Sequence, residues 1–212
     1  MNSSINVWKF IFSVLIVILH INVVFDTGKL QGMYIFADWF YVLAGFTLAR
    51  RVDKIDKNSN AFVESCIIVK DRLKSILPYY FVSSTIALIM KLRFGVIKIE
   101  DAYYVHRIIY EYLLLEMTPL NPVRLTDTAW FLSAMWMALV IITPLAVKFR
   151  RHFFRFSIII YVLIFMYFYK NSLGVYGPGE WTDIGYKGFY RAIADISIGT
   201  FAYELSLIID FF

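Results

Sequence analysis

Two ionisable side chains lie within a long apolar run near the start of the chain, and their spacing could support acid–base chemistry. The run covers residues 6–25, which is long enough to cross a hydrocarbon layer of about 30 Å as a helix. Lys9 and His20 are eleven positions apart, so a helix would bring them onto one face, about 16 Å apart along its axis. An ionisable residue inside a membrane span usually faces a cavity or a partner, so this pair marks a candidate site.

A neutral imidazole is suited to general-base chemistry, because it can take a proton from an alcohol near neutral pH. His20 could therefore activate a hydroxyl group. The same residue could equally be a neutral imidazole that hydrogen-bonds to a neighbouring helix. Spacing by itself leaves both interpretations of His20 open.

The composition is that of a membrane protein. Of the 212 residues, 60% are hydrophobic and only 17% are charged, against about 25% in a typical soluble domain.

A single cysteine, Cys66, excludes an internal disulfide and any cysteine-based metal site, and we predict no metal and no bound cofactor. The net charge of +5 could suggest nucleic acid, but the basic residues cluster between apolar runs, which indicates membrane topology. We therefore expect no nucleic-acid partner.

Apolar runs recur along the whole chain and predict an all-α polytopic transmembrane helical bundle in a single domain, 5–211. The basic, partly apolar segment 62–74 has the pattern of an amphipathic helix on the membrane surface, and 99–117 could be a second, partly buried helix. Pro78 suits the entry of a new helix after the first of these. We predict about six spans, at 6–25, 33–49, 76–90, 128–147, 153–169 and 187–211.

Orientation follows from the Lys and Arg residues in the connections. The second connection carries seven and the fourth carries four, whereas the first carries one and the fifth carries two. Because basic connections stay on the cytoplasmic side, we predict that both termini are cytoplasmic. We expect the chain to lie in the cell (cytoplasmic) membrane, surrounded by lipid. Lys9 would then sit at the cytoplasmic end of the first span and His20 most of the way across.

The second connection would bring further cations to the foot of the first span. Lys70, Arg72 and Lys74 could gather near Lys9 and bind phosphates, with arginine making two-pronged contacts and lysine acting as a point charge. The same residues could be only the orientation signal, or a patch for anionic lipid. Arg72 is the strongest candidate for a ligand contact, because it stands six residues before Pro78 at a span entrance.

Three more residues are candidates for a structural or substrate cavity. Asp38 lies among aromatic residues of the second span and could face the bundle or an interface. Arg191 and Asp195 are four positions apart in the last span, so they could pair on one helix face. Trp130 opens the span at 128–147.

The first half of the chain carries motifs that resemble the acyltransferase family 3 group of integral membrane enzymes. That family has a basic residue, ten arbitrary residues and a histidine in its first span, as in Lys9 and His20. Its second span reads roughly Phe-Phe-x-x-Ser-Gly-Phe, and here 40–46 reads FYVLAGF, with Ala44 in place of the serine.

Three further motifs follow in the family's order. An Arg-x-x-Arg-x-x-Pro motif is similar to 72–78, where Ser75 replaces the second arginine and Lys74 stands beside it. The sequence WFLS at 130–133 resembles a Trp-Tyr-Leu-Ser opening of a later span, and 188–205 resembles an Arg-plus-Leu-Gly segment. Five motifs in order cover nearly the whole chain. The family has more spans than the six predicted here, so we expect a short or C-terminally truncated member.

The resemblance implies an enzyme that transfers an acyl group, usually acetyl, from acyl-CoA to a hydroxyl of a carbohydrate or cell-surface glycan. It implies that His20 is the catalytic base and that Lys9 and Arg72 support the site or the donor, and we expect Lys70 and Lys74 of the same basic connection to help bind the donor. Acetyl-CoA would be a donor substrate rather than a bound cofactor. A partner protein or self-association is an option for so short a chain. The competing hypothesis is a non-catalytic polytopic protein, such as a glycan flippase, a transporter element or an inactive remnant.

Overall fold

A computed structural model describes residues 3–24, 35–95, 108–120, 129–174, 177, 179–183 and 185–209. The described residues form an all-α bundle without β-strands, in which Trp181 and Tyr186 make one isolated bridge. A short helix at 108–112 lies between the third and fourth of the long helices. The long helices are α1 (Ser3–Val24), α2 (Ile35–Val52), α3 (Ala61–Arg93), α5 (Ala129–Phe149), α6 (Arg151–Lys170) and α7 (Lys187–Ile209).

Four of these helices, α3, α5, α6 and α7, are long and apolar enough to cross a membrane. The protein is therefore an all-α membrane protein, as predicted, but the described residues give fewer spans than the expected six. In α1 the apolar stretch Ile5–Ile21 is shorter than a full span. In α2 the charges of Asp38, Arg50 and Arg51 fall within 18 residues and lower its apolar character.

α3 is one continuous helix where the sequence suggested two elements. It starts at a cap on Asn60, whose Oδ1 accepts the backbone N–H of Phe62 at 2.9 Å and of Val63 at 3.2 Å. It then runs through Pro78, which lacks the N–H that would bond to the carbonyl of Lys74. The prediction that Pro78 opens a new helix is wrong. At 33 residues α3 is about 50 Å long, more than a hydrocarbon layer requires.

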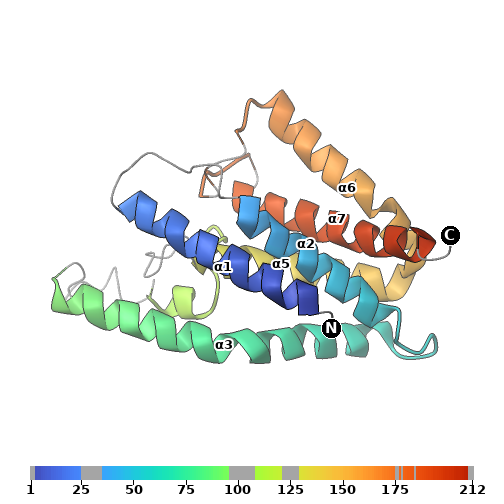
Figure 1. The fold of residues 1–212 in the computed structure, drawn as a ribbon, viewed down its shortest axis with the longest axis horizontal. Coiled ribbons are helices and arrows are strands. Elements are labelled where there is room, and N and C mark those ends of the chain that lie inside the picture. The colour runs from blue at the N-terminus through green and yellow to red at the C-terminus, as the bar shows by residue number, and fades with distance from the viewer. Residues whose placement is uncertain are drawn as a thin grey trace.

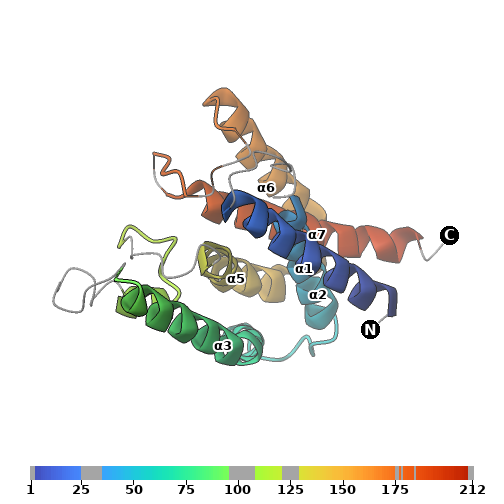
Figure 2. The ribbon, with the colours of Figure 1, turned by 60° about the vertical axis from the view of Figure 1, so that its left-hand side comes forward.

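The helices stack in layers around α2 and α7. Figure 2 shows α5 between α3 and α7, and in both views α6 covers the opposite side of α7 (Figure 1, Figure 2). α1 lies across α2 on the outside, and Leu19 is the one buried side chain among its residues 5–21 (Figure 1). The core is therefore made by α2, α5 and α7, and α1 is attached to it lightly.

α2 and α7 run in the same direction and touch through two glycines. A methyl group on Gly45 would meet the carbonyl oxygen of Ile196 at 2.0 Å, and one on Gly199 would meet that of Val42 at 2.0 Å. No side chain fits in either place, so the two backbones approach as closely as small-residue contacts in membranes allow. These contacts fix which residues of α2 and α7 lie at the same level.

The connection between α5 and α6 is tighter than the predicted basic hinge at 148–152. Only Arg150 separates the two helices, with φ at +48°. Its guanidinium donates to the carbonyl oxygens of Ile55 and Asp56, each at 2.7 Å. This arginine therefore ties the α5–α6 turn to the α2–α3 connection, and the start of α1 and the end of α7 lie at that same end of the bundle (Figure 1).

The segment before α5 is held by Ser133. Its hydroxyl donates to the carbonyl oxygen of Leu114 at 2.7 Å and accepts the backbone N–H of Met117 at 2.9 Å. The helix predicted at 99–117 is confirmed only at 108–112, because 113–118 form turns and 96–107 lie outside the described residues. The serine of the WFLS motif thus fastens a surface segment to the bundle.

Candidate functional site

Lys9 and Arg72 lie on one small cavity between four helices. Lys9 comes from α1 and Arg72 from α3, and both side chains are half-buried. The cavity has a volume of about 250 Å³. Besides these two cations and Thr47 its lining is apolar: Phe40, Leu43 and Ala44 from α2, Ile76 from α3, and Phe131, Leu132 and Met135 from α5.

Neutral oxygen atoms of α2 hold the Arg72 guanidinium in place. Its Nη2 donates to Thr47 Oγ1 at 2.5 Å and to the carbonyl oxygen of Ala44 at 3.1 Å. The Thr47 hydroxyl lies 2.9 Å from the carbonyl oxygen of Leu43, to which it can donate. Ala44, which stands where the resembling family has serine, thus contributes only its backbone to the arginine.

No carboxylate in the described part of the chain forms an ion pair with Lys9 or Arg72. Two cations without acidic partners at an apolar cavity favour an anionic ligand that carries a small apolar group. The volume lies near the lower end of small-molecule pockets, roughly 300–1,000 Å³. The cavity is therefore large enough for a phosphate or an acyl end, and too small for a whole nucleotide-bearing donor.

The other predicted site residues on α1 and α3 lie elsewhere. His20 is half-buried and is not among the residues that line the cavity, since it stands three turns further along α1 than Lys9. Lys70 and Lys74 are exposed and lie two positions on either side of Arg72, which places them on other faces of α3. The structure thus brings together Lys9 and Arg72, and does not bring His20, Lys70 or Lys74 to the same cavity.

Arg191 pairs across helices rather than along its own. Its Nη2 donates to both carboxylate oxygens of Asp38 on α2, at 2.5 and 2.6 Å. The sequence suggested Asp195 as the partner, one turn away on α7. Asp195 does interact electrostatically with Arg191, but the direct ion pair is with Asp38. Asp38 therefore faces the bundle, which was one of its two predicted positions.

An aromatic contact between α2 and α5 lies at the wall of the cavity. Trp130 is buried at the start of α5 and packs edge-on against Phe131. Phe131 in turn stacks on Tyr41 with ring centroids 4.4 Å apart, and its carbonyl oxygen accepts the Tyr41 hydroxyl at 3.1 Å. Because Phe131 also lines the cavity, Trp130 supports the wall of the cavity rather than its interior.

Thr47, Tyr41 and Phe131 are site residues that the sequence analysis did not single out. Thr47 had a usable signal, because it stands three and four positions after Ala44 and Leu43 and so shares their helix face. Tyr41 and Phe131 stand inside the motifs at 40–46 and 130–133, but no spacing rule predicts their contact, because it joins helices 90 positions apart.

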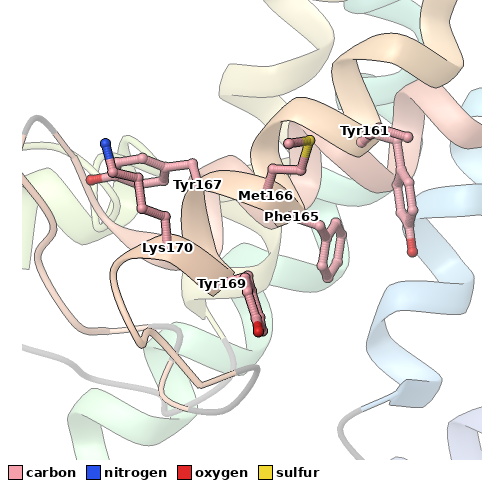
Figure 3. A pocket seen from close by; sticks show the side chains of 7 residues that line it. Tyr161, Phe165, Met166, Tyr167, Tyr169 and Lys170 are labelled. Carbon is pink, nitrogen blue, oxygen red and sulfur yellow. The ribbon is translucent and has the colours of Figure 1, made fainter.

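A larger groove of about 610 Å³ runs along α6, but few of its lining side chains could take part in catalysis. All of its lining residues come from α6, and most are aromatic or apolar (Figure 3). Tyr161 lies at one end of the groove and Lys170 at the other (Figure 3). In a membrane protein an open, mostly apolar groove of this kind faces lipid, so it is not our candidate active site.

No family model matches the chain, and neither a curated protein nor a solved structure matches it. Among the described residues, no group of three or more His, Cys, Asp or Glu side chains could hold a metal ion. The candidate site is therefore defined by the geometry of the Lys9–Arg72 cavity.

Proposed function

We propose that this protein is a membrane acyltransferase that transfers an acyl group, such as acetyl, from acyl-CoA to a hydroxyl group of a carbohydrate or cell-surface glycan. The observation that carries the proposal is the Lys9–Arg72 cavity, where two cations from distant parts of the sequence line one apolar space and have no acidic partner among the described residues. The motif resemblance to acyltransferase family 3 supports it. In this proposal the protein lies in the cell membrane with both termini in the cytoplasm, where the donor is available.

The two cations would hold an anionic part of the donor. Arg72 is well placed for this, because Thr47 and Ala44 fix one nitrogen of its guanidinium and leave the others to bind oxygen atoms. The acyl end would extend along α1 toward His20, a separation of about 16 Å along the helix axis. A long, extended donor such as an acyl-CoA could bridge that separation, whereas a free acyl phosphate could not.

His20 would act as the general base. It takes the proton of the acceptor hydroxyl while the hydroxyl oxygen attacks the thioester carbonyl. The new C–O bond forms, the C–S bond breaks, and the departing thiolate is protonated by the imidazolium. The products are an ester and free coenzyme A, and His20 returns to its neutral form.

The experiment measures release of coenzyme A from acetyl-CoA by purified protein in the presence of a glycan mixture. We expect His20→Ala to lower the rate by about 100-fold or more without changing acetyl-CoA binding, because general-base catalysis contributes about 10²–10⁴-fold. We expect Arg72→Gln to weaken acetyl-CoA binding by about tenfold, the loss of one charge-assisted contact. Lys70→Gln is the matched control, since Lys70 is exposed outside the cavity. Unchanged transfer in His20→Ala would contradict the mechanism.

A non-catalytic anion-binding membrane protein is the second candidate. His20 lies outside the cavity lining, and this position favours the second candidate, because Lys9 and Arg72 can bind an anion without a general base. In the same experiment this protein would bind acetyl-CoA or phosphate in an Arg72-dependent manner and release no coenzyme A. The rate and the binding measurement together distinguish the two functions.

A further inference from the structure

Two carboxyl groups and one guanidinium meet where α2 contacts α7. Arg191 is 1% exposed and Asp195 is 4% exposed, and Asp38 reaches the same place from α2. Asp38 acts on Asp195 both through its charge and as a hydrogen-bonding side chain. If both carboxyl groups were ionised, the cluster would carry a net charge of −1 inside the bundle.

The hydrogen bonds of this cluster do not account for all its polar atoms. Both oxygens of Asp38 are occupied by Arg191 Nη2. Among the described residues, no donor reaches the buried Asp195 Oδ2 and no acceptor reaches the buried Arg191 Nη1. An ionised carboxylate oxygen that is buried without a donor is strongly unfavourable in an apolar interior. A proton on the carboxyl pair removes this penalty, and it also supplies the hydrogen that a bond between two carboxyl groups requires.

The other basic residue of α7, Lys187, forms an ion pair with Glu180, so it leaves the charge of the cluster unchanged. Tyr41 of α2 and Tyr161 of α6 also interact electrostatically with the cluster. A phenol is neutral near neutral pH and adds no cation. The helices cannot separate to admit solvent at little cost, because Gly45 and Gly199 hold the α2 and α7 backbones in direct contact nearby.

We propose that Asp38 and Asp195 form a proton-binding site inside the bundle, in which the two carboxyl groups share one proton at neutral pH and together neutralise Arg191. The site does not depend on the acyl-transfer proposal. It makes the contact between α2 and α7 conditional on that proton, because its loss would place two carboxylates against one guanidinium.

Infrared spectroscopy of the purified, full-length protein at neutral pH tests the site. The C=O stretch of protonated carboxylic acids is compared between wild type, Asp195→Asn and Asp38→Asn, in water and in deuterium oxide. We expect a deuterium-sensitive acid band in the wild type that is lost in both variants. It is lost in Asp38→Asn because Asp195 then becomes the one carboxylate that balances Arg191 and releases its proton.

Glu204→Gln is the matched control. Glu204 is also buried, but it contacts Arg155 at 2.8 Å and Arg151 at 3.8 Å, so two guanidinium groups balance its charge and we expect its replacement to remove no acid band. The amide band in the same spectra reports whether each variant keeps its helices. Identical acid bands in wild type and Asp195→Asn would overturn the proposal. An acid band that survives Asp38→Asn in a folded protein would assign the proton to Asp195 alone and overturn the shared site.

Discussion

Arg191 and Arg72 are both held within the bundle, yet their surroundings differ in one decisive respect. Arg191 lies in the α2–α7 core, is almost fully buried and forms an ion pair with Asp38. Arg72 lies between α3 and α2 and is held by a hydroxyl and a carbonyl oxygen, neither of which carries a charge. The first arginine is neutralised by Asp38, whereas the second lies beside a cavity and has no carboxylate partner among the described residues. The comparison separates a charge that fixes the fold from a charge that can bind a ligand.

The packing around the two arginines differs in the same way. The α2–α7 contact is closed by glycines, with no room for one methyl group. The Lys9–Arg72 side has an open space of about 250 Å³ and is covered by α1, which buries little of its own surface. A close-packed, neutral region resists change, whereas a loosely covered, charged region tolerates it. Substitutions should therefore affect stability on one side of the bundle and binding on the other.

The largest loss of stability is expected from Arg191→Met. This change leaves two buried carboxyl groups without their cation, and removing one member of a buried ion pair costs about 3–5 kcal/mol. Thermal unfolding in detergent measures the loss, and Arg72→Met is the matched comparison because Arg72 has no carboxylate partner in the described residues. Equal losses in the two variants would remove the distinction between the two arginines.

A smaller loss of stability is expected from Gly199→Ala. The added methyl group would lie 2.0 Å from the carbonyl oxygen of Val42, so α2 and α7 must separate. Overpacking of this kind costs about 1–3 kcal/mol. Thermal unfolding again measures the effect, with Gly174→Ala as the control, because a methyl group there meets nothing within 4 Å. A Gly199→Ala protein as stable as the control would show that the helix contact is not close-packed.

An intermediate effect is expected from Ser133→Ala. The buried N–H of Met117 and carbonyl of Leu114 each lose their hydroxyl partner, and an unpaired buried group costs about 1–3 kcal/mol. Because Ser133 holds a surface segment, we expect faster proteolysis near residues 113–120 with little change in the core. Global unfolding without early cleavage there would place Ser133 with the core residues instead.

The smallest effect on stability is expected from Lys9→Met. Lys9 is half-buried and has no ion pair among the described residues, so the change in unfolding free energy should stay within about 0.5 kcal/mol. Binding of acetyl-CoA, measured by calorimetry on the same sample, should nevertheless weaken. A large loss of stability with unchanged binding would assign Lys9 to the fold and not to the site.

The sequence predicted most helices well, because helix formation depends on neighbours along the chain. Apolar runs predicted α1, α2, α5, α6 and α7 to within a few residues wherever the ends are described. It failed at Pro78, where a local rule favoured a new helix and the chain continued as one. In a membrane-spanning helix a missing backbone hydrogen bond can be tolerated, so the local signal did not decide the outcome.

What the sequence by itself determined was the class of the protein and the position of its helices, since length and apolarity act locally. The tertiary structure alone decided which charges meet. Lys9 and His20 lie on the same helix, but the packing of the helices places Lys9 in the lining of a cavity with Arg72 and leaves His20 outside that lining. Arg191 found its partner 153 positions away, and no spacing rule reaches that far. The physical reason is that ion pairs and cavities form between helices, and the α2–α7 glycine contacts set the level at which the helices meet.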